Sequence, residues 1–269
     1  MPTARSEKLR ALAQRVTEAL PAEAVEVVLT GSVARGAADD VSDLELLVVT
    51  DEQISLEEAF ELARRAGLEE RDSWGDPLTP TRRVSGYLDG EPVETIWWPR
   101  ELAAELFATG GSAEALANGV ALRTTGLLAG WQEQLADYPD ALVAERVEKA
   151  AERWGGYTPA ALLTIVRPDC SLARMEWLVD SAQHVLAIVF ALNRVHEPTA
   201  KRLAARVEPL ASKPERLAER IDQALAEPDP RRALLTMTEL QLDTVRLAPS
   251  GPNVDRARTW LAEGIEVLR

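Results

Sequence analysis

The sequence has few of the residues that build disulfide or zinc sites. Cys170 is the only cysteine, and His184 and His196 are the only histidines among 269 residues. A single cysteine excludes an intrachain disulfide, and this scarcity argues against a structural zinc cluster. A hydrophobic core must therefore hold the fold, and the chain is long enough for two domains.

Long apolar runs are also missing from the sequence. No stretch reads as long and apolar enough to cross a membrane. The first 16 residues are charged and amphipathic and contain no apolar signal core. We therefore expect a cytoplasmic protein without a membrane partner.

Positive charge is scarce in the first part of the chain. Residues 1–110 carry 11 lysines and arginines against 22 acidic residues, and the whole chain has a formal charge of −14. An acidic surface repels nucleic acid and attracts cations. The charge thus argues against a nucleic-acid partner and favours a cationic small molecule.

Two short motifs stand close together in this acidic half. The run GSVARG at 31–36 offers backbone N–H groups and the Ser32 hydroxyl to phosphate oxygens. The run SDLEL at 42–46 places Asp43 and Glu45 on one face of a strand, because side chains alternate. Such carboxylates suit Mg²⁺, which binds one or two of them together with substrate phosphates. The two motifs predict a site for a metal and a nucleotide.

The pair Gly31-Ser32 followed by Asp43-x-Glu45 resembles the signature of the nucleotidyltransferase superfamily, which includes DNA polymerase beta. The spacing and the surrounding sequence look most like the aminoglycoside (antibiotic) adenylyltransferase branch, although Glu45 replaces the commoner aspartate. The resemblance implies Mg²⁺-dependent transfer of AMP from ATP to a hydroxyl of a small cationic acceptor such as an aminoglycoside, with release of pyrophosphate. Asp43 and Glu45 would hold the metal, and Gly31 and Ser32 the phosphates.

A third carboxylate is expected on a neighbouring strand, where it can accept the proton of the acceptor hydroxyl. Glu94 lies in the apolar run VETIWW and resembles the catalytic glutamate of the aminoglycoside branch. The alternative is a solvated glutamate on an edge strand. Arg35 is either a phosphate contact or a surface residue, and the neighbouring Asp89 and Glu91 are expected to be solvated at a turn.

The elements predict an α+β fold with two domains. Helical spacing at 5–20 and 55–66 accompanies strand patterns at 25–30 and 43–49 and a hairpin at 82–98. Residues 1–105 are expected to form a catalytic domain, a mixed sheet with flanking helices. Residues 106–269 are expected to form an all-helical domain that closes over substrate and nucleotide, with the active site in the cleft between the two. The helices expected after residue 100 are 100–107, 112–118, 128–137, 140–154, 171–195, 199–211, 214–226, 231–246 and 253–268.

The helical half adds three candidate ligand contacts. Lys201 looks like the lysine that contacts the triphosphate in the antibiotic branch, and we expect it in the first turn of a helix. Glu176, Asp180 and His184 recur at intervals of four and share one helix face. That face could bind amino groups of a cationic acceptor through Glu176 and Asp180, or it could be solvated.

Two other functions fit the same motifs. A nucleotidyltransferase toxin that modifies tRNA or protein would keep the chemistry and change the acceptor, but a tRNA acceptor would require a basic surface. A non-catalytic regulatory protein would bind nucleotide without transfer. The sequence leaves open the acceptor, the base of the nucleotide and the oligomeric state.

Overall fold

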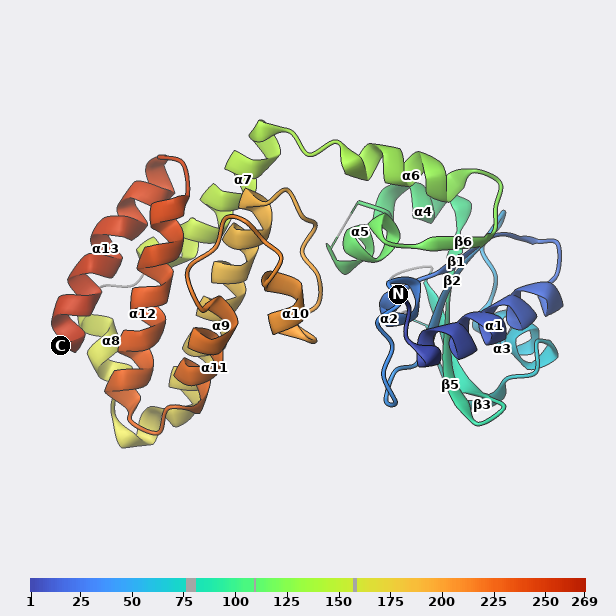
Figure 1. Cartoon of the computed structure of the whole chain (residues 1–269), viewed down its shortest axis with the longest axis horizontal. Helices are drawn as coiled ribbons and strands as arrows, with labels where there is room; N and C mark the ends of the chain where they lie inside the picture. The colour runs from blue at the N-terminus through green and yellow to red at the C-terminus, as the bar shows by residue number, and fades with distance from the viewer. Residues whose placement is uncertain (76–80, 109, 157–158) are drawn as a thin grey trace. The chain divides into compact units, whose positions relative to one another are not determined.

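The computed structural model describes residues 1–75, 81–108, 110–156 and 159–269. The chain forms two compact units, Met1–Asp137 and Tyr138–Arg269 (Figure 1). The α+β class expected from the sequence is confirmed. The sequence placed the domain boundary at residue 105, whereas the first compact unit continues to Asp137.

The first unit is built on a six-stranded mixed sheet with the order β3-β4-β5-β2-β1-β6. Among the described strands, only β2 and β5 pair in parallel, and the four other neighbouring pairs are antiparallel. The strands are β1 (Ala24–Leu29), β2 (Leu44–Thr50), β3 (Glu69–Gly75), β4 (Arg82–Leu88), β5 (Glu91–Pro99) and β6 (Val120–Arg123).

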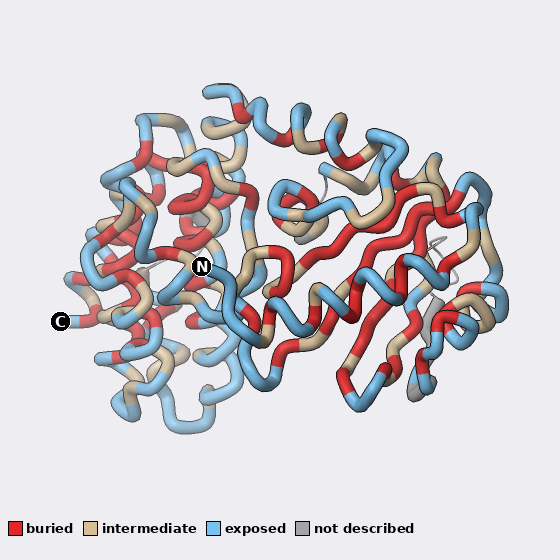
Figure 2. Tube along the Cα trace, turned by 45° about the vertical axis from the view of Figure 1, so that its right-hand side comes forward, coloured by how far each residue is buried: buried red, intermediate tan, exposed pale blue. Residues whose placement is uncertain are grey.

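Helices cover both faces of this sheet, and the central strands are buried (Figure 2). Side chains of α1 and α3 form one core with alternate residues of the strands, among them Leu44 and Leu46. The other face carries Leu47 and Val49 and packs against α4, α5 and α6. The helices of this unit are α1 (Ala4–Ala19), α2 (Gly31–Ala34), α3 (Leu56–Arg65), α4 (Arg100–Leu106), α5 (Gly110–Ala117) and α6 (Leu127–Ala136).

The second unit is entirely helical in its described part. Its central helix α9 contacts α7, α8, α11 and α12. The elements are α7 (Asp140–Glu152), η1 (Arg153–Gly156), α8 (Pro159–Ile165), η2 (Pro168–Cys170), α9 (Ser171–Leu192), α10 (Leu203–Val207), α11 (Leu217–Ala226), α12 (Pro230–Leu247) and α13 (Pro252–Leu268).

One described segment, Pro168–Leu192, is long and apolar enough to cross a membrane by length and composition. The expectation that no such segment exists is therefore wrong. Half of the apolar window is buried inside the helical unit. The buried apolar residues of α9 lie between Leu178 and Ala191 and belong to the protein core, whereas Leu172, Met175 and Val179 are exposed. Because α9 is the central helix of that unit, the segment does not indicate a membrane protein.

Most predicted elements are present, with three additions and one correction. Strands β3 and β6 and helix α8 were not expected. The helix expected at 199–211 is reduced to α10, because Arg202 adopts a left-handed backbone conformation with a φ of 58° at its N-cap. Lys201 therefore lies in an exposed turn before α10 and not in a helical turn.

Candidate active site

The parallel pairing of β2 and β5 brings two of the predicted carboxylates together. Glu45 and Glu94 are direct partners in the register, so their side chains stand on the same face of two strands that lie about 5 Å apart. Asp43 lies immediately before β2, and the buried residues Leu44 and Leu46 alternate with it. The structure thus brings Asp43, Glu45 and Glu94 to one region of the sheet.

Gly31 lies directly against the Glu45 carboxylate. Its φ is +66°, and a Cβ built on Gly31 would lie 1.7 Å from Glu45 Oε2. No residue with a side chain fits there unless Glu45 moves. The backbone of Thr30 also donates a hydrogen bond to the Glu45 carbonyl at 3.0 Å. The turn expected to hold phosphate is therefore in contact with a residue expected to hold metal.

The short helix α2 carries Ser32 and is fixed from α1. Arg10 donates from Nη2 to the Ala34 carbonyl at 2.7 Å and from Nε to the Val33 carbonyl at 3.2 Å. These bonds satisfy carbonyl groups that a helix leaves unpaired at its C-terminus. Thr30 occupies the N-cap position of α2. Ser32 is partly exposed within the helix.

Arg35 follows α2 and is ion-paired within the first unit. Its Nη1 lies 3.4 Å from Oε1 of Glu114, a buried residue of α5. Asn118 also donates to Glu114, at 3.3 Å. Arg35 is thus anchored to α5, and its side chain is 25% exposed.

Glu94 is only 9% exposed. Arg83 on β4 donates a hydrogen bond from Nη2 to Glu94 Oε2 and forms an ion pair with it. The alternative of a solvated edge-strand glutamate does not hold, because β5 lies inside the sheet between β4 and β2.

Glu91, expected to be solvated at a turn, is instead buried. Arg5 and Lys8 of α1 each place a nitrogen 2.5 Å from one of its carboxylate oxygens. Hydrogen bonds from these two cations lower the pKa of Glu91 to about 2. Arg5 also donates to the Ser42 carbonyl at 3.1 Å. This network joins the residue before Asp43 to the start of the strand that carries Glu94, and no sequence motif revealed it.

The carboxylates fit a divalent cation as part of a shared coordination shell. Glu45 and Glu94 place like charges on neighbouring strands, an arrangement that costs stability unless a cation compensates it. Arg83 supplies one positive charge beside Glu94. Within the described ranges, no group of three or more His, Cys, Asp or Glu residues is arranged to hold a metal. A metal on Asp43 and Glu45 would therefore need phosphate and water oxygens as well, as Mg²⁺ commonly does.

In the second unit, Glu176 and Asp180 line a cavity of about 620 Å³. Other lining residues include Trp177, Gln183 and Arg153. Asp180 is flanked by Arg153 at 3.7 Å and by His184 Nδ1 at 3.6 Å. The cavity size is in the range of small-molecule sites. Lys201 does not line it.

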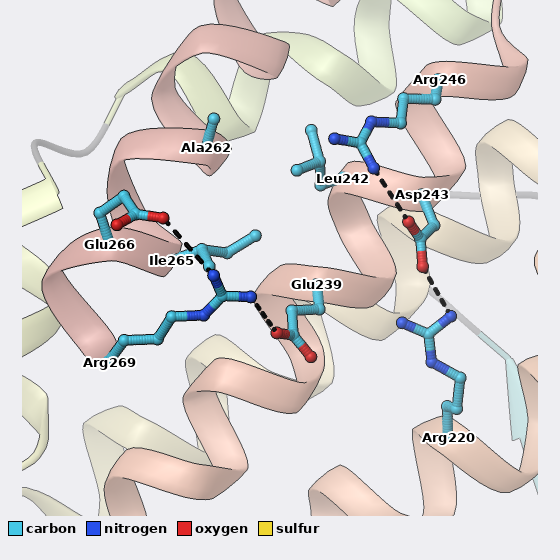
Figure 3. Close-up of a pocket in the computed structure, with 9 residues that line it drawn as sticks. All are labelled: Arg220, Glu239, Leu242, Asp243, Arg246, Ala262, Ile265, Glu266 and Arg269. Atoms are coloured by element: carbon cyan, nitrogen blue, oxygen red, sulfur yellow. Dashed lines mark hydrogen bonds and ion pairs between the residues drawn. The ribbon is translucent and has the colours of Figure 1, made fainter.

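Another cavity of the second unit, about 350 Å³, is shown in Figure 3. Its charged residues come from α11, α12 and the C-terminal end of the chain and pair with one another. Asp243 joins Arg220 and Arg246, while Arg269 joins Glu239 and Glu266. The charges balance, so the cavity offers no excess charge to a ligand.

The motif region also matches a known family. Residues 9–80 match the family model described as nucleotidyltransferase domain. This match supports the resemblance to the nucleotidyltransferase superfamily. The matched residues include Gly31, Ser32, Arg35, Asp43 and Glu45 and end before Glu94.

The finer assignment receives no support from the comparisons. One similar solved structure is a nucleotidyltransferase-like protein from Exiguobacterium sibiricum 255-15, with 16% identity and a TM-score of 0.31, covering 98% of this chain and 74% of that chain. No curated protein matches the chain. The nucleotidyltransferase domain supports transferase chemistry with a nucleoside triphosphate and a divalent metal, and the aminoglycoside branch is left as a proposal.

Proposed function

We propose that the protein transfers AMP from ATP to a hydroxyl of a small cationic acceptor, such as an aminoglycoside, and releases pyrophosphate. The pairing of Glu45 with Glu94, beside Gly31, carries this proposal. It brings together the turn that would bind phosphate, a carboxylate that would bind the metal and the candidate base. The family match over residues 9–80 supports the same chemistry.

Each residue would have a separate role. Asp43 and Glu45 would hold Mg²⁺, and the turn at Gly31 and Ser32 would hold phosphate oxygens. When bound, the metal would neutralise phosphate charge as it develops in the transition state. Glu94 would accept the proton of the acceptor hydroxyl.

Four further residues would bind the remaining groups of the two substrates. Arg35 and Lys201 would contact the phosphates of ATP. Glu176 and Asp180 would bind amino groups of the acceptor. Their place in a 620 Å³ cavity beside Trp177 supports this role, because carboxylates and aromatic faces both attract organic cations.

The test is a screen for pyrophosphate release from ATP and MgCl₂ over a panel of aminoglycosides. We expect release with at least one acceptor and its loss on chelation of the metal. Asp43→Asn should lower turnover at least about 100-fold, because a metal ligand is lost. Asp40→Asn, which changes an exposed aspartate of the same loop, is the matched control.

The outcomes separate the three functions. Full activity of Asp43→Asn would remove the metal assignment. Binding of ATP by calorimetry without release for any acceptor would favour a regulatory nucleotide-binding protein. Transfer of the label to tRNA or protein, but to no small molecule, would favour a toxin.

A further inference from the structure

We propose that Arg83 is a positioning residue, which holds the Glu94 carboxylate in the orientation that accepts the acceptor's proton. This inference rests on the proposed function, in which Glu94 is the base. It concerns a residue that lies outside both sequence motifs and outside the segment matched by the family model.

The sheet register places Arg83 on the same face as Glu94. Ser85 is the direct antiparallel partner of Glu94, and Arg83 is two residues away on the same strand. Residues separated by two on a strand share a face. The guanidinium therefore reaches Glu94 diagonally from β4, while Glu45 approaches from β2 on the opposite side.

The contact engages one carboxylate oxygen and leaves the other available. Oε2 of Glu94 accepts the bond from Arg83 Nη2, and Oε1 accepts none from the described residues. Glu94 is nearly buried, whereas the Arg83 side chain is 49% exposed. The cation thus lies on the outer side of the carboxylate. Without it, repulsion from Glu45 would favour rotation of Glu94 away from β2.

The transfer step shows why orientation matters. The acceptor O–H bond breaks, and its proton goes to Oε1 of Glu94. The hydroxyl oxygen forms a bond to the α-phosphorus, and the bond from that phosphorus to the bridging oxygen breaks. Pyrophosphate leaves with the bonding electron pair. Arg83 takes no proton in this step; its charge-assisted hydrogen bond to Oε2 fixes the geometry of the carboxylate.

The experiment compares Arg83→Ala, Arg83→Lys and Arg82→Ala in the full chain, with ATP, MgCl₂ and the acceptor found by the screen. Arg82→Ala is the matched control, because alternation points Arg82 to the other sheet face. We expect Arg83→Ala to lower kcat about 10- to 100-fold with a KM for ATP within about twofold of wild type. Arg83→Lys, which keeps a donor and the charge, should recover most of kcat, and Arg82→Ala should match wild type.

Several results would overturn the inference. Wild-type kcat in Arg83→Ala would do so, as would failure of Arg83→Lys to recover kcat while its thermal melting matches wild type. In a double-mutant cycle, Arg83→Ala should add no further loss to Glu94→Gln, and full additivity would contradict coupling. Full activity of Glu94→Gln would overturn the proposed base itself, which separates the two claims.

A second readout does not depend on turnover. Protein labelled with ¹³C-glutamate gives a side-chain carboxyl signal for Glu94, assigned by its loss in Glu94→Gln. We expect this signal to shift in Arg83→Ala and to stay in place in Arg82→Ala. An unchanged signal in Arg83→Ala would show that the contact does not hold the carboxylate in solution.

Discussion

At the scale of single residues, Gly31 shows why the phosphate-binding turn and the metal-binding strand depend on each other. Its positive φ favours glycine, and its Cα lies against the carboxylate of Glu45. The sequence predicted that the glycine turn and the carboxylate pair belong to one site for a metal and a nucleotide. It could not predict their contact, because the contact depends on the pairing of β1 with β2.

We predict that Gly31→Ala lowers the free energy of unfolding by about 1–3 kcal/mol, because the left-handed backbone is strained and the methyl group displaces Glu45. Gly90→Ala is the matched control. Gly90 has a φ of +77°, but nothing lies within 4 Å of a Cβ built there, so that variant carries the backbone strain alone. Urea unfolding measures both. Equal losses in the two variants would contradict the close approach of Glu45.

Glu91 shows what the sequence reading missed at this scale. Next to the turn at Asp89 and Gly90, it was expected to be solvated, yet two cations from α1 neutralise it. Sequence separation hides this pairing, because Arg5 and Lys8 are more than 80 positions away. Glu94, by contrast, could be selected as the candidate base from the sequence, because a glutamate stands out within an apolar strand.

We predict that Glu91→Gln lowers the free energy of unfolding at pH 7 by about 1–2 kcal/mol, because it removes the charge partner of Arg5 and Lys8. The pKa of Glu91 is about 2 in the folded protein and 4.5 ordinarily. Its stabilisation is therefore complete above pH 4.5 and is lost as the pH falls from 4.5 to about 2. The difference in the free energy of unfolding between wild type and Glu91→Gln should therefore become smaller as the pH falls through this range.

Glu61→Gln is a control for this prediction. Two arginines also lower the pKa of Glu61 to about 2, but all three side chains are more than a third exposed. Solvent screens such pairs, so the variant should differ little from wild type. Unfolding in urea at pH 7, 5 and 3 tests both variants. If the free energy of unfolding of Glu91→Gln differed from that of wild type by the same amount at all three pH values, the lowered pKa of Glu91 would be contradicted.

At the scale of elements, local signals predicted most of the fold. Helix α3 lies within the range 55–66 expected from helical spacing and begins with a capping box of Ser55 and Glu58. The turn at Asp89 and Gly90 joins β4 to β5 in the hairpin expected at 82–98. Strands β3 and β6 gave no such signal. Both lie at the ends of the sheet order, and their sequences EERDSWG and VALR show no regular alternation of apolar and polar residues. Strand β6 pairs with β1, which is distant in sequence, and β3 pairs with β4, the next strand along the chain. Pairing with a neighbouring strand, not a local sequence pattern, determines the structure of both.

At the scale of the whole molecule, the first unit needs more of the chain than the sequence indicated. Residues between 106 and 137 supply the buried side chains Leu116, Leu128, Trp131 and Leu135 to one sheet face. Glu26, fully buried on β1, accepts backbone hydrogen bonds from Thr125 and Leu128 at the start of α6. A domain that ended at residue 105 would lack these side chains, and that face of the sheet would be uncovered.

We therefore predict that a fragment of residues 1–137 folds cooperatively, whereas a fragment of residues 1–105 does not. Loss of the cover exposes an apolar sheet face, at about 25 cal/mol for each Å² of surface. Thermal melting followed by circular dichroism distinguishes the two fragments. A cooperative transition of equal midpoint in the shorter fragment would contradict the observed extent of the unit.

The central claim is that Asp43, Glu45 and Glu94 act together in nucleotidyl transfer. Mass spectrometry of the acceptor after incubation with ATP, MgCl₂ and wild-type protein tests it most directly. We predict that the acceptor gains the mass of one AMP with the wild type and gains nothing with Asp43→Asn or Glu94→Gln, both folded by circular dichroism. An acceptor modified equally by all three proteins would contradict the claim.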